Sequence, residues 1–213
     1  MPMNKTIEQK LNEGRSFRSM EMRALEDDSY IVEGYATTFN EPYQLYSEPG
    51  WRLLEQVDSR AFDEADMDDV IMQYDHEGRV FARRSNGTLE LEADDHGLKI
   101  RANLGGTEIG RQLYEEIKGG YTTKMSFGFT VDKDDRKTEK TEEMTTVTRT
   151  ITGIKKLYDV SAVSLPANDA TEISARCEGE GVIAEAKQEM QAAEELRVQR
   201  EELIALIKTL KEA

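Results

Sequence analysis

One serine and one histidine in this chain could act as a nucleophile and its base. Ser126 lies in the mainly apolar run 125–129, and His76 follows closely on the apolar run 70–74. A serine hydroxyl becomes an effective nucleophile when a histidine accepts its proton. The sequence holds only 2 histidines, so the base can be only His76 or His96. If the fold brings Ser126 and His76 together, the expected chemistry is attack on an acyl bond.

The third member of such a site would be a carboxylate that orients the histidine. Asp159 lies within the mainly apolar stretch 157–163, where an unpaired charge is costly. Pairing with an imidazole would fix its tautomer and stabilise the imidazolium formed during proton transfer. Each of the three residues also has a plain structural interpretation, as a strand serine, a surface histidine or a solvent-facing aspartate. The residues alone leave both interpretations open.

Other kinds of site have little support from the residue types. The two histidines lack the spacing of a metal site, so we expect no metal and no cofactor. Cys177 is the only cysteine, which excludes an intrachain disulfide, and its polar surroundings do not suit a catalytic thiolate. His96 lies in the segment 94–97, Asp-Asp-His-Gly, which is typical of a hairpin turn.

The charge balance restricts the classes of partner. The formal net charge is −15, from 43 acidic and 28 basic residues. Such a surface repels phosphate backbones, so we expect no direct binding to nucleic acid. No apolar run is long enough to span a membrane, and residues 1–10 lack the hydrophobic core of a signal peptide. We therefore expect a protein without membrane contact that stays in the compartment where it is made.

Strand patterns dominate the chain as far as residue 168. Residues 29–39 are rich in β-branched and aromatic side chains, residues 51–57 are predicted as another strand, and residues 88–93 and 98–103 flank the turn at 94–97. These segments predict that the candidate site is built mainly on a β-sheet.

One helix interrupts the strands. Three apolar residues at four-residue spacing predict it, with Thr107 as its N-cap and Gly119 at its end: Ile109, Leu113 and Ile117. The strand that carries Ser126 follows, then a predicted charged loop over 132–143 and a predicted strand pair over 144–165.

The C-terminal segment has a different composition. Three leucines recur there at seven-residue spacing: Leu196, Leu203 and Leu210. These leucines would form the apolar stripe of an amphipathic helix, and Gln199 interrupts that stripe. The pattern is therefore compatible with a coiled coil with a second copy and with a helix packed on its own domain. We predict a mobile arm over 1–17, a folded domain over 18–176, and a linker with the C-terminal helix over 177–213. This tail is expected to be separable, with a cleavage point near 179–181.

Five segments, in this order and spacing, resemble the prohead (procapsid) maturation proteases of tailed bacteriophages, which are distant relatives of the herpesvirus assemblins. In chain order they are 32–40, 74–77, 95–98, 119–129 and 157–168. The resemblance covers roughly residues 19–175.

The resemblance implies a serine endopeptidase packaged inside the assembling procapsid, in the host cytoplasm. It would cleave scaffolding segments of the major capsid protein and commonly itself. The implied fold is α+β and mainly β, a closed or nearly closed barrel-like sheet wrapped by a few helices, here followed by the C-terminal amphipathic helix. By position, Ser126 corresponds to the nucleophile, His76 to the general base and Asp159 to the third member.

The chain departs from the family pattern at two places. Many relatives have glutamate where this chain has Asp159, and the assemblins use a second histidine, so His96 is an alternative third member. Ser59-Arg60 replaces the usual Pro-Gly, and we expect an altered turn there without loss of activity. The alternative function is a non-enzymatic acidic scaffold or assembly chaperone of a viral capsid.

Overall fold

The computed structural model describes residues 16–25, 29–164 and 180–212. The chain divides into two units, residues 1–178 and 179–213. Most of the predicted N-terminal arm and of the predicted linker, including Cys177, lies outside the described residues. Ser16 and Phe17, at the end of the predicted arm, begin the first strand.

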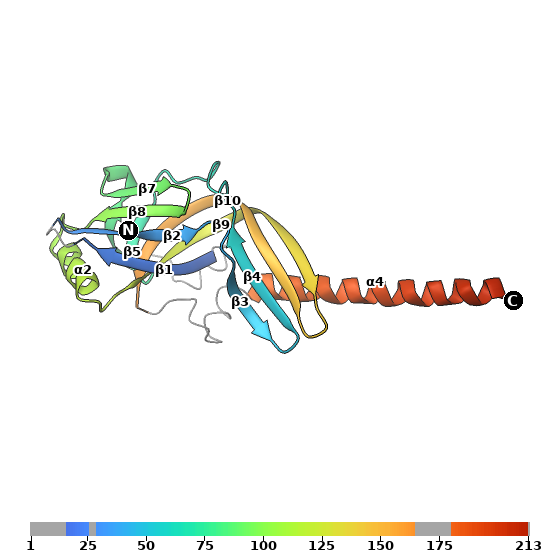
Figure 1. Cartoon of the computed structure of the whole chain (residues 1–213). Helices are drawn as coiled ribbons and strands as arrows, with labels where there is room; N and C mark the ends of the chain where they lie inside the picture. The colour runs from blue at the N-terminus through green and yellow to red at the C-terminus, as the bar shows by residue number, and fades with distance from the viewer. Residues whose placement is uncertain (1–15, 26–28, 165–179, 213) are drawn as a thin grey trace. The chain divides into compact units, whose positions relative to one another are not determined.

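The first unit is built on one mixed sheet, which has ten strands among the described residues (Figure 1). Its path runs β3-β4-β10-β9-β1-β2-β8-β7, with β5 paired to β10 and to β6. The strands are β1 (Ser16–Ala24), β2 (Ile31–Thr38), β3 (Tyr43–Glu48), β4 (Trp51–Val57), β5 (Ile71–Tyr74), β6 (Glu77–Arg83), β7 (Leu89–Ala93), β8 (Gly97–Asn103), β9 (Lys124–Lys140) and β10 (Thr145–Val163). The prediction of a mainly β fold is confirmed.

The sheet is not closed into a barrel, so that part of the predicted fold is wrong. In the described residues, β3 and β7 end the path and do not pair with each other. The two ends are attached to opposite parts of the longest strands. β4 pairs with residues 145–151 of β10, whereas β1, which leads to β2, β8 and β7, pairs with residues 124–129 of β9. This separation keeps the two edges apart.

The predicted charged loop over 132–143 is also wrong. β9 continues through Lys140, and β10 pairs with it in antiparallel register along most of its length. The predicted strand pair over 144–165 is the single strand β10. Strand pairing is made by the backbone, and the solvent-facing positions of a ribbon accept charged side chains, so the charge of this segment does not prevent a strand.

The predicted helix is confirmed as α2 (Glu108–Lys118). Thr107 caps it, because its side-chain oxygen accepts a hydrogen bond from the backbone N–H of Gly110 at 3.0 Å. The helix buries Leu113, Tyr114 and Ile117 against the core of the sheet. Its contacts with the sheet are made mainly to β1 and β2.

A buried cluster of charges ties three strands together. Glu55 of β4 accepts hydrogen bonds from Arg18 of β1 at 2.6 Å and from Arg149 of β10 at 2.9 Å. Tyr43 donates a third, at 2.6 Å. Burial alone would raise the pKa of Glu55, but the two arginines and the hydrogen bonds outweigh burial and hold its pKa below 4.5. Glu55 is therefore a buried anion that holds two cations in place.

The second unit contains α4 (Glu180–Glu212), which confirms a C-terminal helix. Arg197 pairs with Glu194 and Glu201, one turn away on either side. Leu196 and Leu203 are exposed. No described helix carries an apolar stretch that would span a bilayer.

Candidate active site

Ser126 is a buried residue near the start of β9. It lies directly opposite Ser161 of β10 on one side and Ser19 of β1 on the other. Its side chain is 1% exposed, and its Oγ has no hydrogen-bond partner within the described residues. A buried hydroxyl without a partner is uncommon, and a catalytic role is one of the explanations for it.

His76 lies in the two-residue turn that joins β5 to β6. Asp75 and His76 both have positive φ, 47° and 58°, as the central residues of a type I′ turn require. This left-handed conformation is unfavourable for residues other than glycine, by roughly 1–2 kcal/mol each. Asp75 fixes the turn to the end of β10: its N–H donates to Ala162 at 2.8 Å, and its carboxylate accepts from the N–H of Ser164 at 2.8 Å.

The structure brings His76 and Asp159 into contact. His76 Nδ1 is hydrogen-bonded to Asp159 Oδ1, and both side chains are buried. β5 runs parallel to β10, with Ile71 beside Asp159 and Tyr74 beside Ala162, so the turn after β5 lies next to the end of β10, and from there the His76 ring contacts Asp159. A carboxylate on Nδ1 favours the tautomer that carries its proton there, so that Nε2 is the nitrogen able to accept a proton.

Ser126 and Asp159 lie on the same face of the sheet. Residues directly opposite each other in an antiparallel pair share a face, as do residues two apart in one strand. Ser161 is opposite Ser126 and two residues after Asp159, and its Oγ donates to Asp159 Oδ1 at 2.7 Å. The structure therefore collects a buried hydroxyl and a carboxylate–imidazole pair around β9, β10 and the β5–β6 turn.

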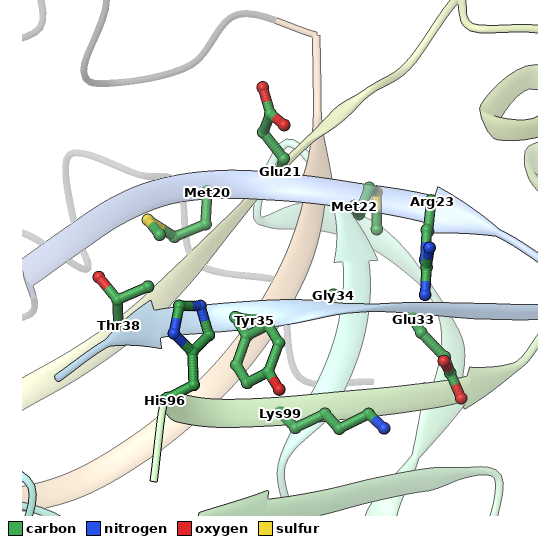
Figure 2. A pocket seen from close by; sticks show the side chains of 10 residues that line it. All are labelled: Met20, Glu21, Met22, Arg23, Glu33, Gly34, Tyr35, Thr38, His96 and Lys99. Carbon is green, nitrogen blue, oxygen red and sulfur yellow. The ribbon is translucent and has the colours of Figure 1, made fainter. Parts of the chain in front are cut away.

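His96 has other surroundings. It lines a cavity of about 600 Å³ over β1, β2 and β8, shown in Figure 2. Its ring packs edge-on against Tyr35 with 4.5 Å between ring centroids, and Tyr35 donates a hydrogen bond to Asp94 at 2.7 Å. That bond raises the pKa of Tyr35. The residue in contact with His76 Nδ1 is Asp159, not His96.

Within the described ranges, no three or more histidine, cysteine, aspartate or glutamate side chains gather in a group that could hold a metal ion. His76 contacts Asp159, which also accepts a hydrogen bond from Ser161, and a carboxylate–imidazole pair of this kind can serve in proton transfer.

The sequence interpretation missed both Ser161 and Asp75. A signal for Ser161 was present: in a strand, residues 159 and 161 point to the same face, so a serine two residues after a buried aspartate is within reach of its carboxylate. The role of Asp75 depends on a contact with Ser164 across the fold, which no local pattern reveals.

Comparison with known proteins gives one family match. The model of the family described as Caudovirus prohead serine protease matches residues 18–185. This range includes every strand of the sheet after the first two residues of β1, and all three candidate residues. No curated protein and no solved structure matches the chain.

Proposed function

The chain belongs to the caudovirus prohead serine protease family, and we propose that Ser126, His76 and Asp159 are its catalytic residues. Membership of this family implies a serine protease of phage capsid maturation. The observation that carries the assignment is the buried contact between His76 Nδ1 and Asp159, on the face of the sheet that also bears Ser126. A carboxylate–imidazole pair beside a buried serine is the arrangement that activates a hydroxyl.

In the proposed mechanism, Ser126 Oγ attacks the carbonyl carbon of the scissile peptide bond while His76 Nε2 accepts its proton. Asp159 holds the ring and stabilises the imidazolium. His76 then returns the proton to the leaving amine, the peptide bond breaks, and an acyl-enzyme remains. Water attacks the ester with His76 again as the base, which releases the acid and restores Ser126. Because Ser126 is 1% exposed, a substrate reaches Oγ only after the covering residues move.

The proposed substrates are scaffolding segments of the major capsid protein and this chain itself, inside the procapsid in the host cytoplasm. Family membership supports a capsid-protein substrate. The proposed division of the chain is an arm over 1–17, a protease domain over 18–176 and a tail over 177–213 that is separated by self-cleavage near 179–181.

A serine-directed phosphonate probe tests the catalytic assignment. We expect the purified chain to be labelled, and the labelling to disappear in Ser126→Ala and His76→Ala, because the probe needs an activated hydroxyl. Ser85→Ala is the control, since Ser85 is exposed and bonds to Asp69. The measurement is intact mass after incubation, repeated under assembly conditions. Labelling that persists in Ser126→Ala would contradict the assignment, and no labelling of the unchanged chain would favour the non-enzymatic scaffold.

We also propose that α4 associates with α4 of a second copy as a parallel two-stranded coil. Leu196 and Leu203 are 67% and 58% exposed at heptad spacing, and this seam needs a partner to be buried. Glu195 and Arg200 flank the seam at positions that pair across a parallel coil.

The double substitution Leu196→Asp with Leu203→Asp is expected to convert a concentration-dependent dimer into a monomer, as measured by sedimentation equilibrium. Glu201→Gln changes the outer face of the same helix and should leave the dimer intact. If the chain without these substitutions sedimented as a monomer at all concentrations, the proposal would be contradicted.

A further inference from the structure

We propose that Ser161 is a positioning residue of the active site, which holds the Asp159 carboxylate against His76. This inference rests on the proposed function, because it assigns a role within the same site. Ser161 is fully buried, at 0% exposure, and its Oγ donates to Asp159 Oδ1 at 2.7 Å. That oxygen is the one in contact with His76 Nδ1. One carboxylate oxygen thus receives both donors.

Asp159 depends strongly on this hydroxyl. Within the described part of the chain, its side chain has hydrogen bonds only with His76 and Ser161. A buried carboxylate that loses a donor keeps its desolvation cost and gains freedom to rotate about its side-chain torsion. Ser161 therefore fixes which oxygen faces the imidazole, and with it the orientation of the ring.

Ser126 and Ser161 differ in their hydrogen bonds, and this difference indicates different roles. Ser126 and Ser161 lie directly opposite each other on β9 and β10 and are both buried. The proton of Ser161 is directed at a carboxylate, so this hydroxyl is occupied in orienting Asp159. Ser126 Oγ has no hydrogen-bond partner within the described residues and can be directed towards a base. The geometry points to Ser126 as nucleophile and to Ser161 as support.

The test compares Ser161→Ala with Ser161→Thr in the full chain. We expect alanine to lower kcat by about tenfold to a hundredfold, the fold-change that corresponds to a hydrogen bond to a charged group, with KM unchanged. Threonine keeps a hydroxyl at this position and should restore most of the rate. Probe labelling should persist in Ser161→Ala, at a lower rate, because the nucleophile is still present.

Nuclear magnetic resonance of the chain with ¹⁵N-labelled histidine reads the contact directly. The chain has only 2 histidines, so His96 serves as an internal reference. In Ser161→Ala we expect the Nδ1 resonance of His76 and its attached proton to shift or broaden, while His96 stays unchanged. This readout does not require Ser126 to be the nucleophile, so failure of the proposed function and failure of this inference are distinguishable.

Two results would overturn the inference. One is a Ser161→Ala variant with unchanged kcat and an unchanged His76 resonance. The other is a Ser161→Thr variant whose kcat is as low as that of Ser161→Ala, with the His76 resonance unchanged in both variants. That result would assign the loss of kcat to packing alone.

Discussion

Replacing Ser126 with alanine is expected to lower kcat by about 10⁶-fold, the loss that follows removal of the nucleophile from a catalytic triad. The residual rate comes from substrate binding and transition-state stabilisation that do not involve the hydroxyl. The change removes one oxygen atom that has no hydrogen-bond partner in the described residues, so it should not lower stability. The loss of rate can therefore be assigned to chemistry.

The measurement has two parts. Cleavage of a peptide taken from the scaffolding segment of the major capsid protein gives kcat, and mass spectrometry of the aged chain follows separation of the tail near 179–181. We expect Ser126→Ala to leave both substrates intact and Ser85→Ala to process both. A purified Ser126→Ala variant that still cut the peptide or itself would eliminate Ser126 as the nucleophile.

Replacing Glu55 with glutamine is expected to lower the free energy of unfolding by about 3–5 kcal/mol, the cost of breaking a buried ion pair by removing one partner. Glu55 is fully buried between Arg18 and Arg149, and glutamine would remove the negative charge that these two buried cations share, although Arg149 would keep its pair with Asp134. The measurement is urea unfolding at pH 7, with intrinsic fluorescence as the signal.

The pH dependence of this effect has a defined sign. The pKa of Glu55 in the folded state lies below its ordinary value of 4.5. The stabilisation is therefore complete above pH 4.5 and is lost as the pH falls through the lower folded-state pKa. The difference in unfolding free energy between the unchanged chain and Glu55→Gln should be constant near neutral pH and narrow below pH 4.5.

Glu21→Gln is the matched control. Glu21 also pairs with a cation, Lys124, at 2.9 Å, but its side chain is 84% exposed. An exposed pair contributes little to stability, so this variant should unfold almost as the unchanged chain does. If the two glutamine variants unfolded alike, the buried cluster would not have the stabilising role assigned to it.

The sequence predicted the individual strands better than their assembly. Turn residues located β7 and β8, and the apolar run 70–74 located β5, because these signals are local. The extension of β9 to Lys140 was not predicted, because a run of charged residues is typical of a loop. The pairing with β10 that makes this segment a strand is not visible in the local sequence. The open path of the sheet was missed for a similar reason: closure depends on which half of a long strand each neighbour joins, and that is not a local property.

The candidate site shows the same division. The residue types and chain order of Ser126, His76 and Asp159 made them candidates in the sequence. The structure has the contact between the His76 imidazole and the Asp159 carboxylate that the sequence analysis considered. The catalytic roles of all three remain a prediction. The hydrogen bonds of Ser161 and Asp75 could be identified only in the structure, because the order of residues in the chain does not specify their geometry.

An open sheet leaves edge strands whose outer backbone groups are not paired within the described part of the sheet. Where β7 ends the path, its outer edge could pair with the same edge of a second copy and start aggregation. β7 carries two exposed acidic residues, Glu90 and Glu92, in a chain of net charge −15. Joining two such edges would bring like charges together, which opposes pairing. The acidic side chains of this edge thus oppose pairing between the sheets of two copies, and this is separate from the association proposed for α4.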